Sequence, residues 1–496
     1  MSTDTRLYVR VGKNVQRWKS VLMALLVIIS ALSSLAANKT QTHARGVATM
    51  VKDINLGGAS EASSFVTLGS VLFFIADDGI HGRELWRSDG TEAGTTMVAD
   101  IQPGSENTFI SRADFLTSFN GKLVFAADDG IHGRELWITD GTTNGTTLVK
   151  DIVPGAETSY INQLVVAGNV LFFVAEDGIH GAELWKSDGT AAGTILVKDI
   201  TLNDNGHFYA PSGLANVNGT LFFSGDFGTI AGQLWKSNGT EVGTTLVKQI
   251  HSYAPSHLGQ YTVANGIIFF TARDAEHGQE LWKTDGTPNG TMIVKDINPI
   301  SSGPFPGDPH SSWPTGLISY QGLLYFFADS NGSYAALWQS DGTSAGTVLV
   351  KDISAGNNSY PSSPVISNDQ LFFSDDTASL GREPWVSDGT TNGTMLLKDI
   401  NPGSTGSFFE LASIFGTIFL SPDDGVHGNE LWISDGTEAG TVLLQDISPG
   451  PLASYPSNFV YVNGMVLFTA DDGVNGRELW SIPLDLNKVY IPLIQR

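Results

Sequence analysis

The chain has 496 residues, a formal net charge of −24 at pH 7 and no cysteine. Nucleic acid is disfavoured as a partner, because its phosphates are bound by clustered Lys and Arg side chains. The absence of cysteine excludes disulfides, thiolate metal sites and thiol catalysis, so the packed core must supply the stability. A hydrophobic fraction of 41% is sufficient for such a core.

The N-terminal segment has the pattern of a secretory signal. Its basic residues are Arg6, Arg10, Lys13, Arg17 and Lys19. The stretch from Val21 to Leu35 is apolar, and Ser34-Leu35-Ala36 offers a cleavage site with small flanking residues. We therefore expect a signal peptide over residues 1–37, a secreted or cell-surface protein, and no stable membrane insertion after cleavage. An uncleaved anchor is the alternative, although the apolar run is shorter than the roughly 20 residues of a spanning helix.

After this segment, one sequence block recurs along almost the whole chain. Its consensus is E-L-W-x-S-D-G-T-x-x-G-T-x-L-V-K-D-I. The tryptophan of the block occurs at Trp86, Trp137, Trp185, Trp235, Trp282, Trp338, Trp385, Trp432 and Trp480. The repeat length, roughly 48 residues, is typical of one four-stranded propeller blade.

A single repeat, residues 116–152, illustrates the strands that the sequence predicts. The expected strands are residues 116–119, 123–127, 135–139 and 147–152. Asn120-Gly121 favours a hairpin between the first two strands, and Asp140-Gly141-Thr142 begins the turn between the last two. Four strands joined by hairpins form a blade, whose apolar faces are buried only by neighbouring blades.

The repeats predict an all-β fold, a β-propeller over residues 48–482 with about nine four-stranded antiparallel blades. The strand 50–54 stands alone before the first full repeat, whereas the last repeat lacks a fourth strand after Trp480. The N-terminal strand is therefore expected to pair beside residues 478–482 and close the ring; an open, curved stack is the alternative. Each repeat tryptophan is expected to pack between blades. Residues 483–496 form a short C-terminal tail.

A second motif, Asp-Asp-Gly-x-His-Gly-x-Glu, has side chains typical of metal sites and of acid–base catalysis. It occupies residues 77–84, 128–135, 176–183 (with Glu176 in place of the first aspartate) and 423–430, and His277 belongs to a more altered copy. Because the motif is spread over many repeats and lost from several, we interpret it as structural. Asp-Gly would form the turn, and His and Glu would satisfy backbone groups.

This structural interpretation assigns no catalytic, cofactor-binding or metal-binding residue and predicts no cofactor. Calcium bound by acidic turns such as Asp77-Asp78 is the alternative, because Ca²⁺ takes carboxylate and carbonyl oxygens. The spacing matches neither an EF-hand loop nor the nonapeptide calcium repeat.

Through the repeated E-L-W-x-x-D-G-T block, residues 48–482 resemble the bacterial ELWxxDGT-repeat proteins, which are also described as hyalin-like. Local departures from the block are Asn238 at the turn aspartate, Ala336 at the glutamate and Pro384 before the tryptophan. The resemblance implies an extracellular repeat protein and brings no catalytic residues. The Ser-Asp-Gly-Thr turn also resembles the Asp-box hairpins of sialidase-type propellers, in which the motif is structural.

Together, these features predict a non-enzymatic binding or structural module whose partner is an extracellular glycan or a surface protein. The alternative is a propeller-type carbohydrate-active enzyme, a glycosidase or lyase with its site at the central channel. Such an enzyme would need one non-repeating cluster of carboxylates, Tyr and Arg on one rim. The loops at residues 203–212, 251–260 and 301–313 are irregular, but the sequence shows no such cluster there. The sequence leaves the oligomeric state open.

Overall fold

The structure is a computed structural model, and most of the repeat region is described in it. The described residues are 46–109, 116–200, 210–227, 230–251, 258–299, 311–330, 335–353, 361–362, 364–377, 379–403, 406 and 409–484. The predicted signal peptide lies outside them, as does the tail from residue 485 onward. Among the described residues, no helix is long and apolar enough to cross a membrane.

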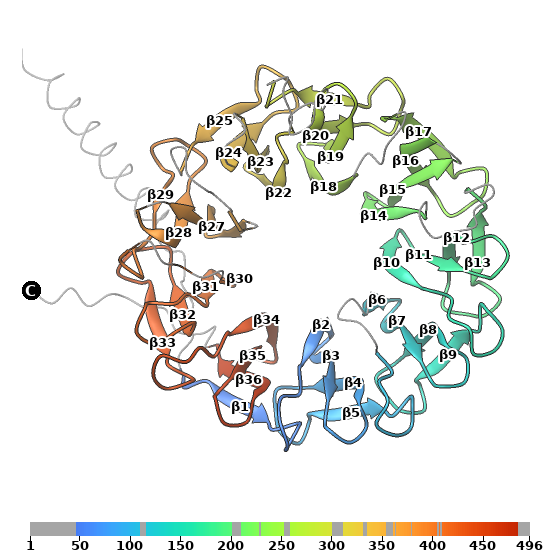
Figure 1. Ribbon diagram of the computed structural model, residues 1–496, viewed down its shortest axis with the longest axis horizontal. Helices are drawn as coiled ribbons and strands as arrows, with labels where there is room; N and C mark the ends of the chain where they lie inside the picture. Colours follow the sequence, from blue (N-terminus) through green and yellow to red (C-terminus); the bar gives the residue numbers. More distant parts are fainter. Residues whose placement is uncertain are drawn as a thin grey trace, which may run out of the picture. The chain divides into compact units, whose positions relative to one another are not determined.

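Within this part of the chain, β-strands form nine four-stranded antiparallel sheets arranged in a ring (Figure 1). The first strand of each sheet lies nearest to the axis of the ring, and the fourth lies at its periphery (Figure 1). The predicted all-β propeller of nine blades is therefore confirmed.

We number the blades in chain order and give each from its inner to its outer strand. Blade 1 is β2 (Ser63–Leu68), β3 (Val71–Asp77), β4 (Arg83–Ser88) and β5 (Thr96–Ala99); blade 2 is β6 (Thr117–Phe119), β7 (Lys122–Asp128), β8 (Arg134–Thr139) and β9 (Thr147–Lys150); blade 3 is β10 (Asn162–Ala167), β11 (Val170–Glu176), β12 (Ala182–Ser187) and β13 (Ile195–Lys198); blade 4 is β14 (Ser212–Val217), β15 (Thr220–Phe227), β16 (Ile230–Ser237) and β17 (Thr245–Gln249).

The remaining blades follow the same order. Blade 5 is β18 (Gly259–Ala264), β19 (Ile267–Asp274), β20 (Gly278–Thr284) and β21 (Met292–Lys295); blade 6 is β22 (Thr315–Tyr320), β23 (Leu323–Asp329), β24 (Ala335–Ser340) and β25 (Val348–Lys351); blade 7 is β26 (Val365–Ser367), β27 (Gln370–Thr377), β28 (Gly381–Ser387) and β29 (Met395–Leu396); blade 8 is β30 (Leu411–Ile414), β31 (Thr417–Leu420), β32 (Leu431–Ser434) and β33 (Val442–Gln445); blade 9 is β34 (Ser457–Val462), β35 (Met465–Asp471), β36 (Arg477–Pro483) and β1 (Thr49–Lys52).

The turns follow from local residue chemistry. Asn120 and Gly121 both have positive φ, at 50° and 75°, as a tight hairpin between β6 and β7 requires. The four strands predicted for residues 116–152 are all present, with ends shifted by a residue or two. At the Asp-Gly-Thr turn of blade 1, Asp89 Oδ1 accepts hydrogen bonds from the backbone N–H and hydroxyl of Thr91, at 2.9 and 2.7 Å. Asn238 accepts the same two bonds in blade 4, so its departure from the consensus preserves the turn.

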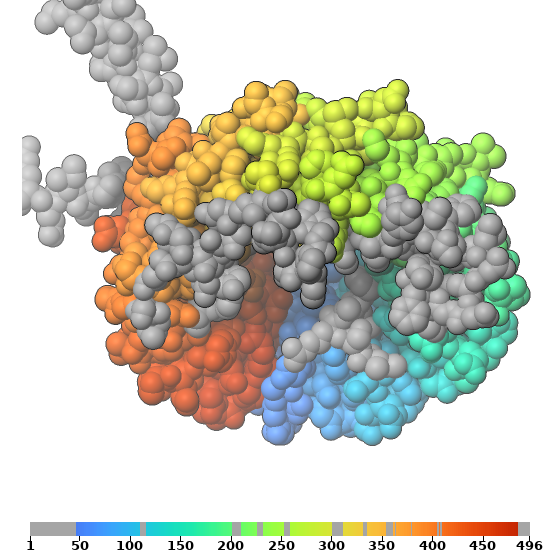
Figure 2. Space-filling view, turned by 45° about the horizontal axis from the view of Figure 1, so that its top comes forward, coloured from blue at the N-terminus to red at the C-terminus, as the bar shows by residue number. Residues whose placement is uncertain are grey.

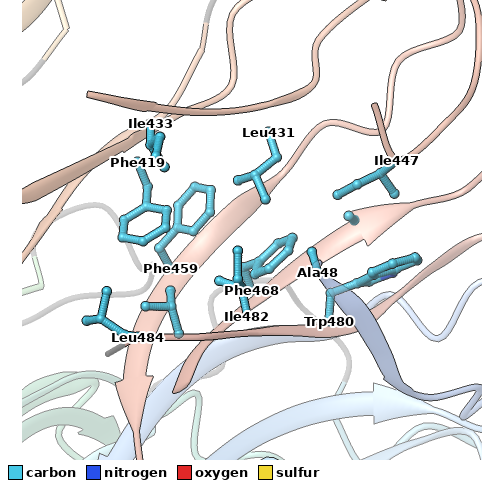
Figure 3. Close-up of a cluster of buried hydrophobic side chains, with 12 residues drawn as sticks. Ala48, Phe419, Leu431, Ile433, Ile447, Phe459, Phe468, Trp480, Ile482 and Leu484 are labelled. Atoms are coloured by element: carbon cyan, nitrogen blue, oxygen red, sulfur yellow. The ribbon is translucent and has the colours of Figure 1, made fainter. Parts of the chain in front are cut away.

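The apolar core lies mainly between neighbouring blades. Trp86 is 6% exposed and packs with Phe74 of its own blade and Val51 of blade 9. Between blades 8 and 9, the stacked rings of Phe419, Phe459 and Phe468 have centroids 5.4 Å apart (Figure 3). The predicted packing role of the repeat tryptophans is therefore confirmed.

A lysine in the fourth strand, or just after it, contacts the next blade in several places. Lys52 Nζ donates to the carbonyl oxygen of Thr95 at 2.9 Å and lies 5.9 Å from the ring centroid of Trp86. The same pair of contacts is made by Lys150, Lys295 and Lys398. The lysine ammonium group therefore lies over the face of the tryptophan ring, and its N–H groups donate hydrogen bonds to the adjacent turn.

The N-terminal strand closes the ring, as predicted. In blade 9, β1 pairs antiparallel with β36, with Met50 opposite Trp480. The backbone of Ala48 exchanges two hydrogen bonds with the Gln445 amide of blade 8, at 2.7 and 3.1 Å. Figure 1 and Figure 2 both show the first blade beside the last. The two ends of the propeller are thus joined without a disulfide.

The closing strand generates a stability prediction. Val51 is 7% exposed and packs in the core between blades 9 and 1, whereas Thr49 on the same strand is exposed. Val51→Asp should destabilise the propeller by about 3 kcal/mol, because a carboxylate would be buried without a partner. Thr49→Asp is the matched control and should change the melting temperature little. Differential scanning calorimetry measures both, and equal melting temperatures for the two variants would show that β1 does not hold the ring.

Candidate functional site

The Asp-Asp-Gly-x-His-Gly loops join the second strand of a blade to its third. In blade 1, Asp78 Oδ1 accepts hydrogen bonds from the N–H groups of Ile80 and His81, and Asp78 Oδ2 lies 2.7 Å from His81 Nδ1. The same Asp–His contact is made by His132 with Asp129, His180 with Asp177, His277 with Asp274, and His427 with Asp424. The histidine thus contacts a carboxylate, whereas the sequence predicted a backbone partner.

Each Asp–His pair is a loop-stabilising contact at the surface. The side chain of His81 is 36% exposed, and its hydrogen bond to Asp78 raises the pKa of the imidazole. Burial pushes the pKa of Asp78 upward, but the hydrogen bonds from His81 and Ile80 outweigh it and the pKa is lowered. Within the described ranges, no three His, Asp or Glu side chains are grouped to hold a metal ion.

The glutamate of the motif is a buried anchor for the connection between blades. Glu135 is fully buried and accepts hydrogen bonds from the N–H groups of Ile152 and Val153, at 3.0 and 3.2 Å, and from the Ser159 hydroxyl at 3.0 Å. Glu84, Glu280, Glu430 and Glu478 accept equivalent bonds. The prediction that this glutamate satisfies backbone groups is confirmed.

Burial also shifts the titration of these glutamates. It raises the pKa of Glu135 to about 7 against the opposing effect of its hydrogen bonds. The pKa values of Glu84, Glu383 and Glu478 are raised to about 7, and that of Glu280 to about 8, for the same reason. Since their carboxyl groups are enclosed and already bonded, they hold the fold and are not presented to a ligand.

Exposed aromatic residues directly follow three of the anchored serines. Ser159, Ser312 and Ser454 are fully buried, and the aromatic residues that follow them are exposed. Tyr160, Trp313 and Tyr455 are 55%, 57% and 58% exposed, with φ values of 48°, 46° and 47°. A bulky residue at positive φ is strained, and such strain is typical of functional surfaces.

These aromatic residues lie at one end of the ring. Each precedes the first strand of its blade by two residues, and that strand lies nearest to the axis. The Asp–His loops lie at the same end, because the third strand of a blade also begins there. We call this the motif end. The Asp-Gly-Thr turns, after the third strand, lie at the opposite end.

Sequence reasoning missed these aromatic positions, although a signal was present. A Ser-aromatic pair recurs as Ser159-Tyr160, Ser312-Trp313 and Ser454-Tyr455, and again as Ser252-Tyr253 and Ser359-Tyr360, which lie outside the described residues. The pair alone does not determine exposure. In blade 2, Phe109 follows Thr108 in the same way, yet it is fully buried.

A pocket of about 500 Å³ opens where blade 9 meets blade 1. Arg83 and Ser63 line it from blade 1, and Arg477, Ser457 and Asn458 from blade 9, together with Glu61. The lining strands β2, β4, β34 and β36 all begin at the motif end. Two guanidinium groups, hydroxyls and an amide therefore converge in one concave site.

Comparisons with known proteins extend no further than the fold. No protein-family model matches the chain, and no curated protein sequence matches it. Among solved structures, puromycin hydrolase is similar at 12% identity and a TM-score of 0.38, over 77% of this chain and 61% of that one. A mutant of that hydrolase complexed with PGG gives 11% identity and a TM-score of 0.35 over the same shares.

A third similar structure comes from an analysis of two prolyl endopeptidases, with 11% identity and a TM-score of 0.36 over 66% of this chain and 50% of that one. The chain therefore spans 61% of the length of the two hydrolase structures. At this level of similarity the matches assign no family and indicate nothing about activity.

The buried glutamates and the paired histidines generate a pH prediction. A glutamate with a raised pKa binds its proton more tightly in the folded state, so its contribution to stability is lost as the pH rises from about 4.5 to the folded pKa near 7. A histidine with a raised pKa also stabilises the fold below its unfolded pKa and loses that contribution as the pH rises. The melting temperature should therefore fall as the pH is raised from about 5 to about 8.

Calorimetry over this pH range tests the prediction. Glu135→Gln should make the profile less steep, because the amide does not titrate while the other buried glutamates still do; Gln233 occupies the same position in blade 4. Glu92→Gln changes an exposed side chain and should leave the slope as it was. A melting temperature that rises between pH 5 and pH 8 would contradict this account.

Proposed function

We propose that this chain is a secreted or cell-surface binding module without catalytic activity, and that its motif end binds an extended glycan. We place it with the bacterial ELWxxDGT-repeat proteins. The observation that carries the proposal is the repeated, strained exposure of Tyr160, Trp313 and Tyr455 at equivalent places in three blades. Aromatic rings present a rigid apolar face with little conformational entropy to lose, and the C–H face of a sugar ring packs against such a face.

The repetition favours a polymeric ligand over a small one. Tyr160, Trp313 and Tyr455 precede blades 3, 6 and 9, so the three platforms are spread around the motif end. A polymer that extends across this end contacts more than one of them, and linked weak contacts add to a higher overall affinity. A glycan is favoured over a surface protein because the neighbours of the aromatics are hydroxyl, amide and charged groups. Around Tyr455, these are Ser457, Asn458 and Arg477.

The non-catalytic role is supported by the partners of the motif residues. The glutamates that could act as acids are buried beneath the blade connections, and each histidine described above contacts an aspartate within its own loop. These contacts repeat from blade to blade, whereas a catalytic centre is a single arrangement of groups. The enzyme alternative has no comparable observation in its favour.

Glycan binding is tested with variants of the three aromatics. The triple variant Tyr160→Ala, Trp313→Ala and Tyr455→Ala should bind a polysaccharide selected from a glycan panel at least about tenfold more weakly, because exposed aromatic anchors carry most of such binding energy. Phe415→Ala is the matched control, since Phe415 is 55% exposed with φ of 48° but lies in the hairpin at the opposite end. Isothermal titration calorimetry gives both affinities.

Two results would refute the proposal. One is a triple variant that binds the panel as well as the unmodified protein does. The other is release of sugars from a panel glycan by catalytic amounts of purified protein, which would establish the propeller-type enzyme instead.

Export is tested separately. The protein collected from the medium or cell surface should begin between about residue 37 and residue 45, because signal peptidase cleaves after small residues such as Ala36. N-terminal sequencing provides the measurement. A protein that retains Met1 and stays in the cytoplasm would contradict the predicted localisation.

A further inference from the structure

We infer that the pocket between blades 9 and 1 binds the carboxylate of an acidic sugar within the glycan, so that the ligand contains uronate-type units. This inference rests on the proposed glycan-binding function and names the ligand class for one part of the motif end. The argument starts from the two arginines, which stand out in a chain with 51 acidic and 27 basic residues.

The position of Arg83 and Arg477 varies among the blades. Its occupant is Ala182, Gly232, Gln279, Ala335 or Asn429 in five others. Where arginine recurs in blade 7, Arg382 forms an ion pair with Asp376 at 2.7 Å and its side chain is 1% exposed. Arg83 and Arg477, by contrast, line a pocket together, and their blades become neighbours only because the ring closes.

The two guanidinium groups have different surroundings, because Arg477 interacts electrostatically with the Glu410 carboxylate. Arg477 donates to the Tyr455 carbonyl at 2.8 Å and to the hydroxyls of Ser457 and Thr469. Arg83 donates to the Ser63 hydroxyl at 3.1 Å, and its Nε is buried with no hydrogen-bond partner. Among the described residues, Arg83 has no carboxylate partner. A partly buried guanidinium that forms no ion pair within the described chain favours an anionic ligand.

The geometry favours a carboxylate carried on a sugar. The planar fork of a guanidinium matches the two oxygens of a carboxylate. The pocket volume of about 500 Å³ lies within the range of roughly 300–1,000 Å³ typical of small-ligand sites. Ser63, Ser457 and Asn458 suit sugar hydroxyls, and Glu61 adds acceptor oxygens that favour a hydroxyl-bearing ligand over a bare anion.

The blade 9 side of the pocket is held in place before a ligand arrives. Asn458 has φ of 61°, and its backbone N–H donates to both oxygens of Glu410, at 3.0 and 3.1 Å. Its amide also donates to Ser457 and Thr469, at 3.3 Å each. Such prior ordering lowers the entropy lost on binding.

The experiment compares an acid with its neutral derivative on the full mature protein. Isothermal titration calorimetry with an oligogalacturonate, an oligomannuronate and the methyl esters of both should show at least tenfold tighter binding of one acid than of its ester. The difference should shrink as salt is added, because an ion pair is screened. A sulfated oligosaccharide of equal length that binds as tightly as the preferred acid would overturn the carboxylate assignment.

Arg83→Gln should abolish the preference for the acid while the ester still binds. The matched control is Arg134→Gln, at the same position in blade 2, where Arg134 Nη1 donates to the carbonyl of Ile161 at 2.6 Å; it should keep the preference. If Arg83→Gln does not fold, the comparison of acid and ester binding to the unmodified protein still tests whether the pocket prefers a carboxylate. Equal binding of acids, esters and neutral glycans overturns this inference and leaves the proposed function intact, whereas binding of no glycan at all overturns both.

Discussion

The enclosed carboxylate at the third strand, present in seven of the nine blades, is the interaction on which most of this propeller depends. A glutamate such as Glu430 accepts hydrogen bonds from the N–H of Ile447 at the end of its own blade and from Ser454, where the chain crosses to the next blade. One buried group therefore sets where a blade ends and where the following inner strand begins. Its desolvation is unfavourable, and it is tolerated because several donors converge on it. The exposed Tyr160, Trp313 and Tyr455 directly follow serines that belong to these connections.

Ring closure depends on the same kind of buried, hydrogen-bonded glutamate. Glu478 in the last blade accepts hydrogen bonds from Ile54 and Ser60 near the start of the chain. The first and last blades are thereby joined in the way that consecutive blades are, and Lys52 adds its contacts with Trp86 and Thr95 across the same junction. A repeat protein with no cysteine thus avoids exposed sheet edges by closure, and the junction creates the pocket that holds both Arg83 and Arg477.

Much of the fold could be predicted because its determinants are local and repeated. The spacing of the tryptophans predicted the number of blades, and Asn120-Gly121 predicted a hairpin. The isolated strand near Met50 predicted how the ring of blades is closed. The site was less accessible, since its determinants are not local. Arg83 and Arg477 are far apart in sequence and meet only through closure, and Tyr160 and Phe109 differ in exposure despite similar preceding residues.

In a repeat protein, the shared residues describe the scaffold, and the departures from them indicate function. In the sequence the Asp–His pairs resembled a catalytic or metal-binding motif, but in the structure they repeat in five blades as contacts within one type of loop. The arginine at the start of the third strand differs from these pairs, because it is not a shared residue of the repeat. Five blades have a different residue there, so packing does not require it, and two blades that retain it place it in a shared pocket. A group that the fold does not need, and that lines a concave site, is a candidate for ligand binding and not only for stability.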